Sequence, residues 1–161
     1  MRRVGLVAVG VVLAVAGLIA LALAFNARDD AGLSGAAQGP GELQPESGGE
    51  WPTSGEHAEA LVTRDRQELS DDQILTALED GNVVILYGGA RPAPALVQLQ
   101  EELAGPFDAE VAAAGQSVIL ARREGAGDAT ALAWRHVLAA PPSSPELREF
   151  AEAWLGRGLG N

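Results

Sequence analysis

The stretch Leu78–Tyr87, which reads LEDGNVVILY, decides the fold of this chain. Its first residues close a short helix, Gly81 is a natural helix stop, and Val83–Tyr87 is continuously apolar and rich in β-branched side chains. A run of this kind is typical of a strand that is buried on both faces of a sheet. The stretch therefore predicts a helix, a tight turn and a central strand, around which the other elements pack.

Helical and strand patterns alternate on both sides of this stretch. Ser70 and Gln73 form a capping box that predicts where the first helix begins. Apolar residues at helical spacing predict two further helices, over 94–104 and 144–155, while 107–115 stays ambiguous. Strand-like runs follow at 117–121 and 130–138, and we expect these two to pair as a hairpin.

These elements predict an α/β (α+β) domain over residues 51–157, built as a small mixed β-sheet with packed helices. The strand, helix and strand between residues 83 and 121 should form a right-handed parallel crossover, because that is the usual hand of such connections. Trp134 and Trp154 are candidates for the core, whereas His136 is expected to face outward from its strand.

An apolar segment precedes this domain. Val4–Phe25 contains no charged residue and is long enough, at about 1.5 Å per residue, to cross a bilayer as one transmembrane helix. Arg2 and Arg3 place residues 1–3 in the cytoplasm and the rest of the chain outside. A signal peptide cleaved near Ala22–Ala24 is the alternative, and the length of the segment favours a signal anchor.

Residues 26–50 are rich in small and polar side chains and contain few large apolar ones. Such a composition cannot bury enough surface to fold, so we expect a disordered, flexible linker. The predicted arrangement is a single-pass protein of the cell membrane, held there by its N-terminal helix, with an extracytoplasmic domain at its C-terminal side.

The composition argues against one class of partner and excludes two kinds of catalytic chemistry. A formal net charge of −11 argues against nucleic acid as a partner, because binding phosphates needs a basic surface. The chain has no cysteine, which excludes disulfides and thiolate chemistry, and it has no lysine, which excludes Schiff-base chemistry.

Three segments together resemble a known family. Trp51–His57 reads WPTSGEH, Leu78–Tyr87 contains an LE-x-G-x-VVI-x-Y pattern, and Ala133-Trp134 follows later. In this order they resemble the bacterial domain-of-unknown-function family 3105, and the resemblance covers residues 51–155. It implies an N-terminal membrane anchor and no established activity.

The chain departs from that family's pattern where chemistry would be expected. The family loop has proline where this chain has Glu56, and its two helix histidines fall on Thr76 and Asp80. His57 and Glu79 keep the residue types of the family pattern. Two histidines at i and i+4 lie on one helix face and suit a metal, so the resemblance implies that such a site is weakened or lost here.

His57, Glu79 and Asp80 are the candidate site residues, and together they could supply one nitrogen and two carboxylates to a divalent metal. The competing interpretation is structural: His57 bonds nearby backbone, and the carboxylates accept backbone N–H groups of the WPTSGEH loop. Thr53 and Ser54 lack the surroundings of a nucleophile and are expected to form turns.

The incomplete polar set favours a non-catalytic interaction or structural module of the bacterial cell envelope, with a protein partner left open. A divalent-metal-binding or metal-dependent domain centred on the WPTSGEH loop and the LEDG helix end is the alternative. A third possibility is a small-ligand cleft at the C-terminal end of the Val83–Tyr87 strand, where open α/β sheets bind ligands.

Overall fold

A computed structural model of the chain describes residues 39–45 and 49–159, which belong to one folded unit. Residues 1–3, the predicted transmembrane segment 4–25 and most of the predicted linker lie outside the described residues. Within the part that is described, no helix is both long and apolar enough to span a membrane.

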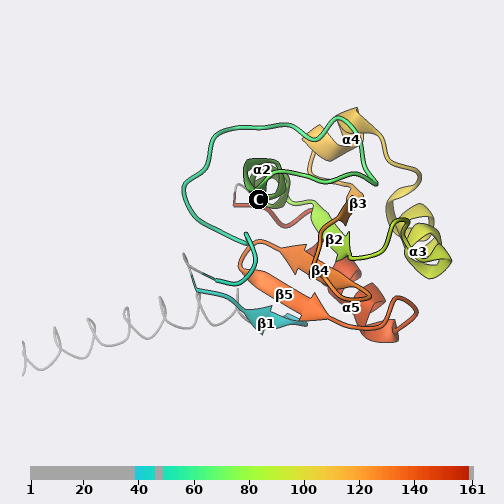
Figure 1. The fold of residues 1–161 in the computed structure, drawn as a ribbon. Helices are drawn as coiled ribbons and strands as arrows, with labels where there is room; N and C mark the ends of the chain where they lie inside the picture. The colour runs from blue at the N-terminus through green and yellow to red at the C-terminus, as the bar shows by residue number, and fades with distance from the viewer. Residues whose placement is uncertain (1–38, 46–48, 160–161) are drawn as a thin grey trace, which may run out of the picture. The chain divides into compact units, whose positions relative to one another are not determined.

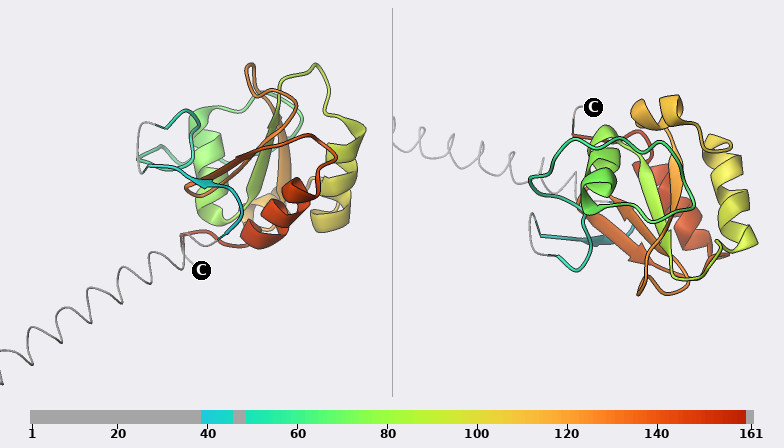
Figure 2. Two further views of the ribbon diagram at one scale, coloured as in Figure 1. Left: turned by 90° about the horizontal axis from the view of Figure 1, so that it is seen from below. Right: turned by 45° about the horizontal axis from the view of Figure 1, so that its top comes forward.

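The unit is a mixed five-stranded sheet with helices on both faces, as Figures 1 and 2 show. The elements in chain order are β1 (Glu42–Leu43), α2 (Asp71–Asp80), β2 (Val83–Tyr87), α3 (Pro94–Ala104), α4 (Ala109–Ala113), β3 (Val118–Arg122), β4 (Thr130–Ala133), β5 (His136–Ala139) and α5 (Pro145–Trp154). The strands lie in the order β1-β5-β4-β2-β3. The predicted mixed sheet with packed helices is therefore confirmed.

Helix α2 begins and ends where its sequence signals predict. The Ser70 side chain accepts the Gln73 N–H at 3.2 Å, and the Gln73 side chain accepts the Ser70 N–H at 3.1 Å. Gly81 closes the helix with a φ of 112°, a left-handed conformation that glycine adopts without steric cost.

Strand β2 is central and its side chains alternate between two cores. It pairs with β3 in parallel and with β4 antiparallel, and all five of its residues are buried. Val83, Ile85 and Tyr87 face α3 and α5, whereas Val84 and Leu86 face the side of α2 and α4. This double burial explains why the strand is apolar throughout rather than alternating.

The turn between α2 and β2 is a junction for distant parts of the chain. The amide of the Asn82 side chain donates to the carbonyls of Ala77 (2.9 Å) and Ala112 (2.8 Å), and its oxygen accepts the Ser117 N–H at 2.9 Å. From the C-terminal side, the N–H groups of Gly156 and Leu159 donate to carbonyls at this turn. One buried side chain thus joins α2, α4 and the start of β3.

The predicted hairpin between 117–121 and 130–138 is wrong. The segment from Thr130 to Ala139 is itself a hairpin, in which β4 and β5 are joined by Trp134 and Arg135, and β4 pairs with β2 instead of β3. Arg135, the second of the two, has a φ of 59°, whereas the φ of Trp134 is not positive; this is the pattern of a type II turn, which favours glycine at the position of Arg135. An asparagine-glycine signal, which usually marks such turns, is absent from the sequence here.

Two further expectations need correction. Residues Glu42–Leu43 form β1 at the sheet edge, so the folded unit includes residues that were assigned to the disordered linker 26–50 and begins before Trp51. His136 does not face outward, because its ring is only 3% exposed and stacks on Trp154 of α5. A polar side chain in an alternating pattern suggested exposure, and tertiary packing overrides that pattern here.

Candidate functional site

The WPTSGEH segment, residues 51–57, is held at two places by its surroundings. The Thr53 carbonyl accepts the Arg135 N–H at 2.8 Å, which joins the segment to the turn of the β4–β5 hairpin. The Ser54 hydroxyl donates to the Pro45 carbonyl at 3.1 Å. Both contacts fix the path of the backbone, and the turn-forming role of the two hydroxyls stays a prediction.

His57 joins this segment to the C-terminal end of α2. Its Nδ1 lies 3.0 Å from the Gly55 carbonyl oxygen, and its Nε2 lies 3.2 Å from Oε2 of Glu79. The imidazole side chain is 9% exposed and the Glu79 side chain 46%. The Trp134 ring lies beside it, with the two ring centroids 6.5 Å apart. His57 is therefore a nearly enclosed histidine with a partner at each nitrogen.

The identity of these partners constrains the chemistry of the ring. A backbone carbonyl and a carboxylate can only accept hydrogen bonds, so a neutral imidazole, which has one N–H, can donate to just one of them. A neutral ring that donates to one of them therefore leaves its other nitrogen facing an acceptor. The pair of contacts links the loop to α2 through the ring.

An open pocket of about 390 Å³ lies next to this pair. Its polar lining includes His57, Glu59 and, from one face of α2, Thr76, Glu79 and Asp80. Burial raises the pKa of Asp80, and the neighbouring charges of Glu79 and Glu59 raise it further, while His57 acts in the opposite direction. The pocket is therefore acidic, and its carboxylates repel one another.

Thr76 stands where the resembling family pattern has its first helix histidine. It is 7% exposed, and its hydroxyl accepts the Ala60 N–H at 3.0 Å, so it helps to attach the segment that follows His57 to α2. A threonine in this position satisfies a backbone donor, which is a structural task.

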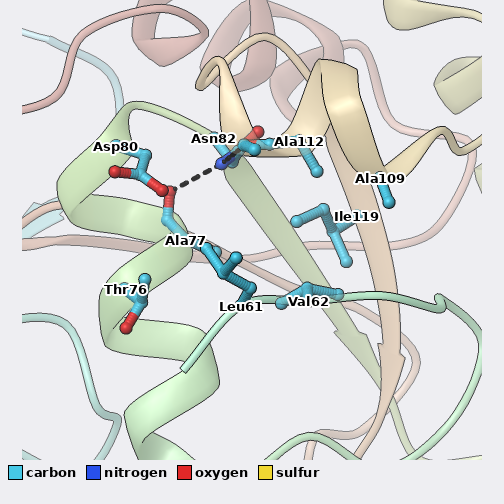
Figure 3. A pocket seen from close by; sticks show the side chains of 10 residues that line it. Leu61, Val62, Thr76, Ala77, Asp80, Asn82, Ala109, Ala112 and Ile119 are labelled. Carbon is cyan, nitrogen blue, oxygen red and sulfur yellow. Dashed lines mark hydrogen bonds between the residues drawn. The ribbon is translucent and has the colours of Figure 1, made fainter. Parts of the chain in front are cut away.

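A smaller cavity of about 10 Å³, room for one water molecule, adjoins the acidic pocket, and Figure 3 shows its lining side chains. It shares Leu61, Thr76, Asp80 and Ala113 with that pocket, and its other walls come from Val62, from the turn residue Asn82, and from α2, α4 and β3. The Asn82 side chain is one of its lining residues, and the dashed line in Figure 3 marks a hydrogen bond of this side chain, which donates to the Ala77 carbonyl. The cavity is too small for a cofactor.

The structure brings the three predicted site residues to one pocket but does not arrange them as a ligand set. His57 and Glu79 are in contact, and Asp80 lines the same pocket. Among the described residues, no group of three or more His, Cys, Asp or Glu side chains could hold a metal ion as placed. Sequence reasoning missed Glu59, whose only signal is that it lies two residues after His57.

The C-terminal end of β2, where a ligand cleft was considered, is occupied by neighbouring backbone. Gly88 donates to the Gly127 carbonyl and Arg123 donates to the Tyr87 carbonyl, both at 3.0 Å. The loop after β3 therefore lies against the position that a ligand would take in an open sheet of this kind.

Comparisons of this chain with models of protein families, with curated proteins and with solved structures found no match.

Proposed function

We propose that this chain is a membrane-anchored extracytoplasmic domain that serves as a non-catalytic interaction or structural module of the bacterial cell envelope. The observation that carries the proposal is the double engagement of His57, whose two ring nitrogens contact Gly55 and Glu79. A residue that tethers a loop to a helix through both nitrogens has no free nitrogen with which to move a proton to or from a substrate.

Other features support the same proposal. Thr76 is also engaged with backbone, through the Ala60 N–H. The uncharged segment 4–25 behind two arginines favours an anchor, and the resemblance of residues 51–155 to family 3105 has the same implication. The acidic surface of the domain suits a partner with basic groups better than nucleic acid.

The membrane part of the proposal predicts a definite topology. In intact cells whose outer layers are permeabilised, an added protease should degrade the domain, whereas a cytoplasmic control protein should survive. The chain should stay in the membrane fraction through a high-salt wash and be released by detergent, because a transmembrane helix is held by apolar burial rather than by charge. Recovery of the domain in the soluble fraction would contradict the anchor.

For the site, we expect that His57→Ala lowers the free energy of unfolding of the full chain and leaves its metal content unchanged. Loss of a nearly enclosed hydrogen bond and of a half-exposed ion pair should cost about 1–2 kcal/mol of unfolding free energy. The corresponding fall in Tm is about 3–8 °C, measured by thermal unfolding in detergent. Glu56→Ala is the matched control, because Glu56 is next to His57 in the chain and its own side chain is exposed. This substitution should change Tm by no more than about 1 °C.

A divalent-metal-binding domain is the second candidate, and one distance favours it. Two ligands of one tetrahedral Zn²⁺, at about 2.0–2.1 Å from the metal, lie about 3.3 Å apart. His57 Nε2 and Glu79 Oε2 are separated by 3.2 Å. The Gly55 carbonyl would fix the His57 tautomer from the opposite side, as the outer partners of metal-ligating histidines do.

Metal analysis by mass spectrometry, combined with thermal unfolding, separates the two candidates. The proposed module predicts less than stoichiometric metal and a Tm that Zn²⁺ or Mn²⁺ leaves unchanged in both the parent and His57→Ala. Stoichiometric metal in the parent, with a rise in Tm that His57→Ala abolishes, would replace the module with a metal-binding domain.

A further inference from the structure

The strand β1 is held at the sheet edge by few contacts. Only two of its residues pair with β5, Glu42 opposite Val137 and Leu43 opposite His136. The Gln44 N–H adds a bond of 2.7 Å to the Arg135 carbonyl. A two-residue strand cannot hold its place by pairing alone, so it also depends on the contacts of the residues on either side of it. After it, the Arg135 guanidinium donates to the Gln44 carbonyl at 3.4 Å and the Ser54 hydroxyl donates to the Pro45 carbonyl at 3.1 Å.

The residues just before β1 rest on α5. The Trp154 indole Nε1–H donates to the Pro40 carbonyl at 2.9 Å. Gly41 lies so close to Phe150 that a Cβ there would be 2.6 Å from the phenyl ring. Trp154 and Phe150 are themselves packed together, with ring centroids 6.4 Å apart. The position of Trp154 therefore controls the attachment of the chain that leads into β1.

His136 supports Trp154 from the sheet. The two rings stack with centroids 3.9 Å apart and an interplanar angle of 26°. Nδ1 of His136 lies 2.8 Å from the Trp134 carbonyl, which can only accept, so the proton of the neutral ring is on Nδ1. Nε2 then carries a lone pair, and within the described residues this buried atom has no hydrogen-bond partner.

The surroundings of His136 oppose a second proton. Burial lowers its pKa, and the adjacent Arg135 cation lowers it further, while the Trp134 carbonyl acts in the opposite direction and does not cancel them. The face of α5 that packs on the sheet presents Leu147, Phe150, Ala151 and Trp154. The acidic residues of α5 and β1, namely Glu146, Glu149, Glu152 and Glu42, are exposed.

We propose that His136 is a proton-operated latch, which holds β1 on the sheet while the ring is neutral and releases it when Nε2 gains a proton. Among residues 39–45 and 49–159 the added N–H would be buried without an acceptor, beside Arg135, and the ring would have to turn toward water to be solvated. Stacking of an imidazolium on indole is attractive in itself, but it leaves that N–H unsatisfied.

If His136 moves, Trp154 loses the ring that stacks on it. The hydrogen bond from the Trp154 indole to the Pro40 carbonyl and the close packing of Gly41 on Phe150 are then lost as well. Release of β1 uncovers the outer edge of β5. The backbone groups of Arg135 and Val137, which pair with the segment 42–44 in the structure, would then be unpaired. Acidification would therefore leave the outer edge of β5 with unpaired backbone groups.

The direction of the pH effect follows from the lowered pKa. An unfolded or released His136 binds a proton near pH 6.5, and the latched one binds it only at lower pH. The latch therefore contributes its full stability above about pH 6.5 and loses it progressively as the pH falls below that value.

The absence of cysteine makes a spin-label test direct. A nitroxide on Glu42→Cys in the full chain reports on β1, and one on Glu101→Cys, an exposed position of α3, reports on the rest of the unit. Between about pH 7.5 and about pH 5 the mobile fraction at residue 42 should rise several-fold, with a midpoint below about 6.5, while residue 101 stays unchanged.

Two histidine variants give the matched comparison. His136→Phe keeps a ring against Trp154 but cannot titrate, so the pH response at residue 42 should vanish. His57→Asn removes the other histidine and should leave the response intact. A response that persists in His136→Phe, or none in the parent, would overturn the latch.

If His136→Phe does not fold, the parent chain still decides the question by NMR. The imidazole of His136 and the amide of Leu43 must then titrate with one shared midpoint. A His136 titration that Leu43 does not follow would equally overturn the proposal.

Discussion

Asn82→Ala is expected to lower the free energy of unfolding by about 3–5 kcal/mol, a large share of the stability of a domain of this size. The substitution removes two donated bonds, to Ala77 and Ala112, and one accepted bond, from Ser117. The two carbonyls also accept the N–H groups of Asn82 and Gly115, whereas the buried Ser117 N–H would lose the acceptor that it has among the described residues. An orphaned buried donor is costly because it has lost its bond to water as well.

Chemical denaturation followed by circular dichroism measures this effect. Asn82→Asp retains an acceptor for Ser117 but turns a carboxylate toward two carbonyl oxygens, so it should be at least as destabilising near pH 7. Gln116→Ala, an exposed neighbour of the same contact, should change the free energy by less than about 0.5 kcal/mol. Equal effects of Asn82→Ala and Gln116→Ala would refute the role of Asn82 as the junction.

Phe150→Ala is the other substitution with a large expected effect, about 3–5 kcal/mol. The ring is fully buried, belongs to the core between the sheet and α5, and packs against Trp154. Its removal leaves a cavity that the rigid sheet cannot close. Because Gly41 rests on the same ring, the loss should also loosen the strand β1.

Two measurements test both parts of this prediction. The Tm should fall by about 10–20 °C. Hydrogen exchange at the Gln44 amide should accelerate more than exchange at the amides of β2. The hydrogen bond of the Gln44 amide to Arg135 depends on the attachment of β1 to the sheet, whereas the hydrogen bonds of β2 do not. Glu149→Ala, the exposed neighbour on α5, is the control and should leave both unchanged. Uniform acceleration throughout the domain would mean that Phe150 stabilises the core without a particular role at β1.

Local signals in the sequence were enough for most of the elements. The capping box of Ser70 and Gln73, the stop at Gly81 and the apolar run of β2 each depend on neighbouring residues, and each is confirmed. The parallel pairing of β2 and β3 was also predictable, since a helix between two strands returns the chain to the same edge.

Features that depend on distant residues could not be predicted in this way. The choice of β4 to pair with β2 is decided by packing across the sheet, and the turn at Arg135 carries no glycine signal. Strand β1 is too short to show a period, and it is fixed by Trp154 and Phe150, far along the chain. The burial of His136 likewise depends on a distant residue, because its ring stacks on Trp154 of α5.

The candidate site was predicted in part. His57, Glu79 and Asp80 were candidates because of their residue types and their places in the resembling family pattern, and the structure places all three at one pocket. Which side chains touch was not predictable, because the path of residues 51–60 over α2 is set by bonds such as that from Ala60 to Thr76.

Because β1 pairs with the sheet through two residues, it would be the first strand to detach if the chain were pulled from its N-terminal side. Tension would enter the folded unit at Gly39 and load first the bond from Trp154 to Pro40 and then the two residue pairs with β5. Strand β2, paired along its length on both sides, would carry load only afterwards. Residues 39–44 would therefore detach first, and their full contour length of about 20 Å, at about 3.4 Å per residue, is the upper limit of the extension before the core is loaded.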